Sequence, residues 1–191
     1  MTTNKKIVQL SLISIGLFLI LATYFLYPTI IKKEVVEDDM IKTDSVEGRD
    51  VFENVKYKGV YDINMPFIVQ AEDAYILTET PDNVFLSNMR VTLHMEDGRA
   101  IIITSRNGYY NKVTYDLTFE NNVKAVDGET TVTAENLDLL ATEDTASVYN
   151  NVFLTNDKGS VQADKVYYNF ETKYYQVSMF SDKKVKIKLI K

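Results

Sequence analysis

The sequence contains no cysteine and only one histidine, His94, among its 191 residues. Without cysteine, the chain can form neither a disulfide nor a thiolate metal site. One imidazole by itself does not make a metal site, and Ser-His-Asp catalysis through His94 would need a G-x-S-x-G motif, which is missing. We therefore expect His94 to be an exposed surface residue on the polar side of a strand.

The sequence also lacks basic stripes and phosphate-binding glycine loops. The net charge is −6, so no surface is expected to neutralise the phosphates of a nucleic acid. The carboxylates lie in expected turns (Asp97, Asp127 and Asp157) or at one position of a repeat (Glu135 and Asp164). They form no cluster that could bind calcium or supply an acid–base pair. No catalytic residue, no metal site and no cofactor are predicted.

A long apolar stretch lies near the N-terminus. Residues Ile7 to Ile31 are 25 residues without a charge. As a helix this stretch would reach about 37 Å, enough to cross a hydrocarbon core of about 30 Å. A cleavable signal peptide is the alternative, but the stretch is long for one and LATYFLYPT is a poor cleavage site. Residues 1–31 are therefore predicted to be a cytoplasmic stub and a transmembrane anchor in the inner membrane, with the N-terminus cytoplasmic.

The segment after this stretch differs in composition. Residues 32–50 are polar and charged without a clear period, which predicts a tether. The alternative is that Val35, Val36 and Ile41 already begin the first strand. The folded domain is predicted to occupy residues 51–191.

From Val51 onward the patterns are typical of β-structure. Apolar and polar residues alternate in RVTLHM at residues 90–95 and again in KKVKIKLI near the C-terminus. Turn signals such as Asp97-Gly98 and Asn107-Gly108 recur between these runs. The nearest match to a helix is AENLDLLATE, but its flanking TTVT favours a strand. An all-β domain is therefore predicted.

A repeat organises this domain. The stretch ENNVKA at residues 120–125 returns as YNNVFL at residues 149–154, an offset of 29 residues, and TAE at 133–135 returns as QAD at 162–164. Repeats of this length indicate stacked supersecondary units that share a continuous core. Each unit is predicted to hold three short strands: one that opens with N-x-V, one that carries T-A-E or Q-A-D, and one rich in tyrosine.

The end of the chain carries lysines in alternation with apolar residues. In the last predicted strand, KKVKIKLIK, the lysines Lys184, Lys186 and Lys188 face one side. On one interpretation, these lysines at the edge of the sheet only prevent aggregation. The edge can also receive a strand of another protein by β-augmentation. On that second interpretation the partner edge comprises Val185, Lys186, Ile187, Lys188 and Leu189.

These features together resemble a known family. A single N-terminal span, a tether, and repeats that carry Asn121-Asn122-Val123, Thr133-Ala134-Glu135, Asn150-Asn151-Val152 and Gln162-Ala163-Asp164 resemble the lipopolysaccharide-export family of LptC, LptA and the N-terminal domain of LptD. The resemblance implies a twisted, open β-jellyroll of stacked antiparallel strands with a period of about 29, preceded by one transmembrane helix. It also implies that the protein is not an enzyme.

The resemblance further implies partners. The span would associate with the LptB-LptF-LptG transporter in the inner membrane. The jellyroll would receive lipopolysaccharide, hold its lipid A acyl chains in an apolar groove, and pass it through the C-terminal edge to an LptA-like bridge protein. A membrane-anchored scaffold without lipid transfer and an enzyme acting on envelope glycans are the alternatives.

The lining of such a groove is predicted from alternation, and from the equivalence of Val123 and Val152 in the repeat. The predicted lipid-binding residues are Tyr75, Leu77, Phe85, Val123, Ala125, Val152, Leu154, Tyr168 and Phe170. The alternative for the same residues is that they pack a closed core.

Overall fold

The computed structural model describes residues 41–46, 48–62, 65–95, 97–180, 182 and 184–190, all within one compact unit, Asp38–Lys191. The predicted anchor at residues 1–31 and the first part of the predicted tether lie outside these residues. Within the described ranges, no helix has the length and apolar character that a membrane crossing needs.

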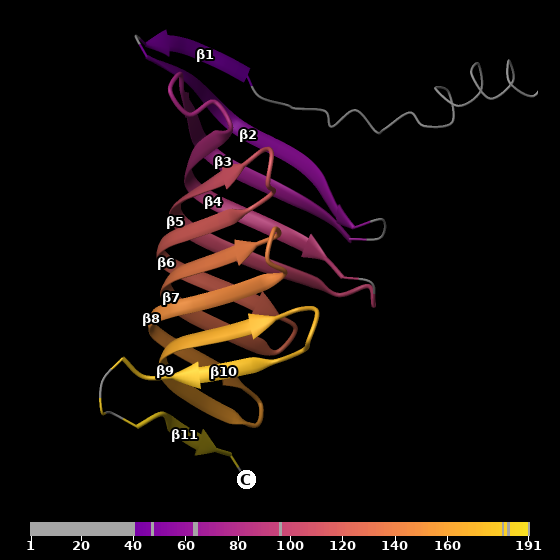
Figure 1. Ribbon diagram of the computed structural model, residues 1–191, viewed down its shortest axis with the longest axis vertical. Coiled ribbons are helices and arrows are strands. Elements are labelled where there is room, and N and C mark those ends of the chain that lie inside the picture. Colours follow the sequence, from indigo (N-terminus) through magenta and orange to yellow (C-terminus); the bar gives the residue numbers. More distant parts are fainter. Residues whose placement is uncertain are drawn as a thin grey trace, which may run out of the picture. The chain divides into compact units, whose positions relative to one another are not determined.

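The described chain forms one antiparallel sheet (Figure 1). Its strands are β1 Ile41–Val46, β2 Arg49–Asp62, β3 Met65–Leu77, β4 Asn83–His94, β5 Ala100–Asn111, β6 Leu117–Asp127, β7 Thr130–Leu140, β8 Thr145–Asn156, β9 Gly159–Asn169, β10 Tyr175–Ser178 and β11 Lys186–Leu189. Each strand from β1 to β9 pairs with the next in the chain, and β11 also pairs with β9. The predicted all-β class and antiparallel stacking are confirmed.

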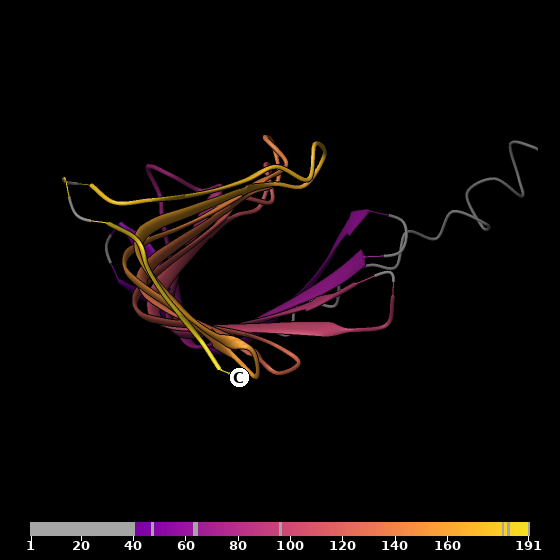
Figure 2. The ribbon, with the colours of Figure 1, turned by 90° about the horizontal axis from the view of Figure 1, so that it is seen from below.

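The sheet is folded over on itself along a line that crosses its long strands. Figure 2 shows the strands as a trough, closed at this bend and open on the opposite side. Asparagines with φ between 51 and 64° mark the line: Asn54, Asn88, Asn121, Asn122, Asn150 and Asn151. Asparagine adopts this left-handed conformation more readily than most residues. We call the line the asparagine corner; it makes the fold an open jellyroll, as predicted.

The corner divides the sheet into two half-sheets that face each other. Half-sheet A contains the strand segments around Tyr110, Leu117 and Leu139, which neighbour one another in register. Half-sheet B contains the segments around Phe67 and Leu93, which are likewise paired. The pairing register shifts at the corner, for example between Glu120 and Val123 of β6, because the residues at the bend are not paired with the neighbouring strand.

The 29-residue repeat corresponds to a hairpin of two long strands, β6 with β7 and β8 with β9. The expectation of three short strands in each unit is wrong. The N-N-V segment does not follow a turn; it bends a single strand at the corner, where Val123 lies opposite Ala134 and Val152 opposite Ala163. The stretch AENLDLL is part of strand β7, as its flanking sequence indicates.

The sheet also begins earlier than expected. Strand β1 and the first two residues of β2 occupy part of residues 41–50, for which a tether is predicted. The two strands pair antiparallel, with Val46 opposite Arg49, and the chain reverses at Gly48, whose φ is 85°. Glycine takes this conformation without steric cost. The start of the folded domain therefore lies before Val51.

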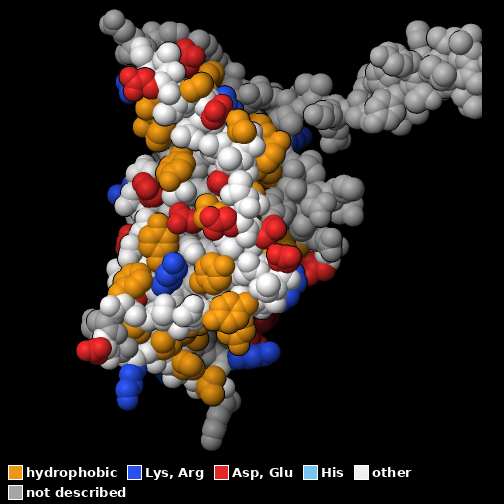
Figure 3. Space-filling view, viewed as in Figure 1, with side chains coloured by type: hydrophobic (Ala, Val, Ile, Leu, Met, Phe, Trp, Pro, Cys, Tyr) orange, Lys and Arg blue, Asp and Glu red, His pale blue; other side chains and the backbone are white. Residues whose placement is uncertain are grey.

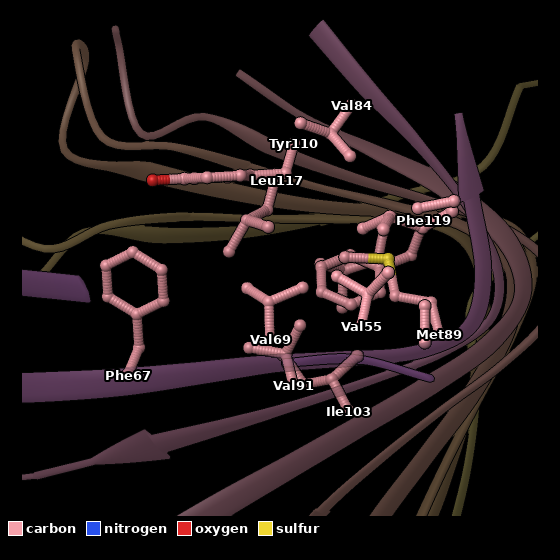
Figure 4. Packing of buried hydrophobic residues seen from close by; sticks show 14 of the residues in the cluster. Val55, Phe67, Val69, Val84, Met89, Val91, Ile103, Tyr110, Leu117 and Phe119 are labelled. Carbon is pink, nitrogen blue, oxygen red and sulfur yellow. The ribbon is translucent and has the colours of Figure 1, made fainter. Parts of the chain in front are cut away.

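Buried side chains are concentrated at the N-terminal end of the trough (Figure 4). One cluster of 15 buried residues fills the space between the half-sheets from β2 to β7, with Val91 and Phe119 both at 0% exposure. The second cluster holds three residues, Ala134, Val152 and Ala163, and all three lie at the corner. The space between the half-sheets is thus fully buried toward the N-terminal end, whereas toward the C-terminal end this second cluster lies only at the floor.

Candidate functional site

Each half-sheet has a rim, formed by the strand ends that lie away from the asparagine corner. A cavity of about 540 Å³ opens between the rims of the two half-sheets. Half-sheet B contributes Phe67 and Leu93, and half-sheet A contributes Leu117 and Leu139. Phe170, from the turn between β9 and β10, also lines the cavity. A volume of several hundred Å³ with a mainly apolar lining is typical of sites for small organic molecules or parts of larger ones.

Below this cavity, toward the C-terminal strands, the inner face stays apolar and accessible. Two ladders of half-buried residues run along it, one on each half-sheet. They consist of Ala125, Val132, Leu154 and Val161 on half-sheet B and of Leu139, Ala146 and Tyr168 on half-sheet A. These side chains are only partly covered, so the inner face of the C-terminal strands is less completely buried than the core between β2 and β7.

Most of the predicted lining residues lie on this inner face. Val123 and Val152 are 2% and 1% exposed and form the floor at the corner. Ala125, Leu154 and Tyr168 belong to the half-buried ladders. Phe170 lies in the cavity, and its ring meets that of Tyr168 edge-on with centroids 5.0 Å apart. The sequence pattern therefore located the inner face of β6, β8 and β9.

Three predicted lining residues, Tyr75, Leu77 and Phe85, lie on the outer face instead. The rings of Tyr75 and Phe85 stack there with centroids 4.9 Å apart, next to Tyr109, which is 37% exposed. The guanidinium of Arg49 lies 5.9 Å from the Tyr75 ring centroid. The prediction that these residues line the groove is wrong.

The physical reason is a change of alternation at the corner. In β3, Val69 and Ala71 are buried before the corner, but Ala74 is the next buried residue after it. One extra residue at the bend therefore moves the inward positions from odd to even numbers. In β6 the two asparagines Asn121 and Asn122 add two residues, so the alternation there is unchanged.

The rim of the cavity is charged. Arg99 donates hydrogen bonds to the carboxylates of Asp97 and Asp127, at 2.6 Å each, which joins the β4–β5 turn to the end of β6. The hydrogen bond from Arg99 lowers the pKa of Asp97. His94 also lines the cavity and is half-buried, so the prediction of an exposed histidine is wrong. Asp97 and His94 thus contribute polar groups to a mainly apolar lining.

Sequence reasoning missed Leu93, Leu117 and Tyr115 as lining residues. Leu93 lies near the end of β4, whereas Tyr115 and Leu117 lie in and directly after the turn between β5 and β6. Only the bend at the corner brings these two places together around one cavity. Alternation places Leu93 on the inner side with Val91, but no local pattern indicates which residues of the opposite rim it faces. Tyr115 lies in a turn, for which alternation makes no prediction.

The outer face has a different character. Figure 3 shows hydrophobic side chains interspersed with acidic ones on the side turned to the viewer, with the basic groups scattered rather than arranged in a stripe. Burial and the neighbouring carboxylate of Asp138 raise the pKa of Tyr149 to about 12. Tyr149 lies on the outer face beside Asp138, so this perturbed group does not belong to the groove. Among the described residues, no group of three or more histidine, aspartate or glutamate side chains could hold a metal ion.

The C-terminal edge of the sheet is divided between two short strands. β10 pairs with residues 165–168 of β9, and β11 pairs with residues 159–162. The predicted strand at the partner edge is present from Lys186 to Leu189, and Val185 directly precedes it. Its apolar side chains are largely uncovered, since Ile187 is 67% and Leu189 77% exposed.

Comparisons with known proteins agree with this architecture. A family model described as LptC, lipopolysaccharide-assembly, LptC-related, matches residues 55–187. The fold is similar to that of LptH from Pseudomonas aeruginosa, described as the LptA-homologous periplasmic component of the conserved lipopolysaccharide transport device. The match has 12% identity and a TM-score of 0.51, and it covers 66% of this chain and 96% of LptH. At this identity the likeness shows a shared fold. A search of the curated proteins finds no match.

Proposed function

Because this chain belongs to the LptC-related family of lipopolysaccharide-assembly proteins, we propose that it holds the acyl chains of lipid A in the groove between its half-sheets and passes lipopolysaccharide onward. Its role in lipopolysaccharide transport at the periplasm follows from the family. The LptC and LptA families are transport and binding proteins.

One observation carries the lipid-binding part of the proposal: the inner face of β6 to β9 is apolar and only half covered. Transfer of an acyl chain out of water is favourable by about 0.8 kcal/mol for each buried CH₂. A groove lined by Ala125, Leu154 and Tyr168 supplies such an environment along several strands. The lipid needs no chemical step here, only a continuous apolar path.

We further propose the membrane arrangement and the direction of transfer. Residues 1–31 anchor the chain in the inner membrane with the N-terminus in the cytoplasm, and the segment after them is a tether to the periplasmic jellyroll. The transmembrane helix and one edge of the sheet contact the LptB-LptF-LptG transporter. The edge that contains residues 185–189 docks an LptA-like bridge protein. The uncharged stretch at residues 7–31 and the uncovered side chains of β11 support these assignments.

Photo-crosslinking in cells tests the lipid-binding proposal. A benzoyl-phenylalanine replaces Tyr168, which faces the groove, and in a matched control it replaces the adjacent Tyr167, which faces outward on the same strand. An antibody against lipopolysaccharide detects the adduct. We expect an adduct at position 168 and little or none at position 167, because the sheet separates the two faces.

Two results would contradict the proposal. Equal labelling at both positions would mean that lipid does not occupy the inner face selectively. If a folded, membrane-bound protein gave no adduct at position 168, at 154 or at 170, the chain would instead be an anchored scaffold that assembles envelope proteins without carrying lipid.

A further inference from the structure

Aromatic rings join the two rims at the N-terminal end of the trough. Phe67 of half-sheet B meets the ring of Tyr110 of half-sheet A edge-on, with centroids 6.0 Å apart. It also meets Tyr115, in the turn between β5 and β6, at 6.5 Å. Figure 4 shows Phe67 rising from one side of the trough toward the ring of Tyr110 that extends from the other. We call Phe67, Tyr110 and Tyr115 the aromatic clasp.

The position of the Phe67 ring is determined by the neighbouring strand. Gly59 of β2 lies directly opposite Phe67 in register. The ring occupies the space that a side chain at position 59 would need, since a Cβ atom on Gly59 would overlap the ring atoms. The absence of a side chain on β2 thus lets the ring lie over the backbone and reach across the trough.

The position of Tyr115 is determined by its turn. The Asn111 side-chain oxygen accepts hydrogen bonds from the backbone N–H groups of Val113 and Thr114, both at 2.9 Å. The chain then passes through Tyr115 with a φ of 63°. Tyr115 remains 42% exposed, although its ring contacts Phe67. The ring therefore acts as an outer cover of the clasp rather than as part of the core.

The space differs on the two sides of the clasp. Behind it, Val69 and Val91 are 1% and 0% exposed, and a hollow that Val69 and Tyr110 help to line measures about 10 Å³. Such a space holds at most one water molecule. On the other side of Phe67 lies the cavity of about 540 Å³. An acyl chain fits only on the second side while the clasp is closed.

We propose that Phe67, held by Tyr110 and Tyr115, sets the N-terminal limit of the acyl-chain site. Acyl chains occupy the groove from the cavity to the C-terminal strands, and they reach the layers formed by β2 to β4 only when the clasp parts. This inference rests on the proposed lipid-binding function and assigns a position to the lipid within the groove.

A photoactivatable lipid tests the inference. The full chain, in detergent, is mixed with a lipid A-type glycolipid that carries a diazirine at the end of one acyl chain, and the labelled residues are mapped by mass spectrometry. For the unchanged protein we expect labels on Leu139, Tyr168 and Phe170 and few on Val69 or Val84.

Tyr115→Asn opens the clasp with little risk to folding, because asparagine accepts the positive φ at this exposed turn. We expect it to raise the share of labels on Val69 and Val84 by about two- to tenfold, the factor that one aromatic contact is worth. Val113→Asn is the matched control in the same turn; Val113 is 65% exposed and makes no ring contact among those described. It should leave the distribution unchanged. Phe67→Leu, which keeps an apolar side chain in the core, should act in the same direction as Tyr115→Asn.

Equal labelling of Val69 and Leu139 in the unchanged protein would overturn the inference. The inference would also be overturned if neither Tyr115→Asn nor Phe67→Leu changed the distribution of labels among the inner residues. A different result, no label on any inner residue in any of the proteins, would refute the lipid-binding function itself. The two failures are therefore distinguishable.

Discussion

Individual asparagines determine where the sheet bends. Asn121 and Asn122 both adopt positive φ, and so do Asn150 and Asn151 one repeat later. For most residues this conformation costs about 1–2 kcal/mol, because the Cβ atom comes too close to the following carbonyl oxygen. Asparagine and glycine adopt it more easily. The two asparagines of the N-N-V sequence therefore recur because the backbone at the corner requires them.

Substitution of Asn151 tests this account. Its φ is 58°, and its side chain is exposed. We expect Asn151→Ala to lower the free energy of unfolding by about 1 kcal/mol, from the cost of a left-handed alanine. Asn151→Gly should cost less, since glycine removes that strain although it increases the entropy of the unfolded chain. Chemical denaturation of the full chain in detergent measures both values.

Asn107→Ala provides the control for the loss of an asparagine side chain. Asn107 is exposed and is not among the residues with positive φ. It should change the unfolding free energy by less than Asn151→Ala does. Equal losses at the two positions would show that backbone conformation is not the reason for asparagine at the corner.

At the scale of single elements, β11 is attached to the sheet in an unusual way. Its four residues are all exposed, so main-chain pairing with β9 provides most of its attachment. Leu189 of β11 lies opposite Gly159, which has a φ of 154°. A Cβ atom at position 159 would overlap the backbone carbonyl oxygen of Lys188. Only glycine lets the two backbones approach this closely.

Gly159→Ala should therefore release β11 from β9. We expect hydrogen exchange at residues 187–189 to become as fast as in an unstructured segment, while β3 to β6 keep their protection. The free energy of unfolding should also fall, by about 1–3 kcal/mol, because alanine is strained at the positive φ of Gly159. Ser160→Ala, one residue along β9, is the control and should leave β11 attached. If Gly159→Ala left the exchange of β11 unchanged, the close approach at Gly159 would not be what holds this strand.

At the scale of the whole molecule, packing falls off from the N-terminal to the C-terminal end of the trough. Fifteen buried residues fill the space between the half-sheets from β2 to β7, whereas the second cluster has three. A jellyroll packed throughout would have favoured the scaffold interpretation. The incomplete packing of the C-terminal half instead supports the proposed groove, and the lysine-bearing edge lies at that same end.

Hydrogen exchange should follow this gradient. Regions with few buried apolar contacts open at lower free energy than the core. We therefore expect the slowest exchange in β3 to β5 and faster exchange in β9 to β11, and a bound lipid should slow the exchange of β7 to β9 most. Mass spectrometry of the full chain with and without lipid measures this. Uniform protection without lipid, or protection by lipid confined to β2 to β4, would contradict the gradient and the location of the groove.

The sequence by itself determined the class of the fold and the main repeat. Alternation in segments such as RVTLHM marks strands because successive side chains point to opposite faces. The 29-residue offset marks the hairpin unit, and the pattern around Val123 and Val152 identified the inner face of β6 and β8. These features are local, so they can be recognised without knowing what lies opposite them.

Only the tertiary structure decided which residues face each other across the trough. Tyr75 and Phe85 lie on the outer face, and not on the predicted inner face, because one additional residue at the corner reverses the alternation. No local sequence pattern indicates that residue. The cavity rim and the aromatic clasp combine Phe67, Tyr110 and Tyr115, which lie up to 48 residues apart (115 − 67). Their contact depends on the bend angle of the whole sheet, which is a property of all strands together and not of any one segment.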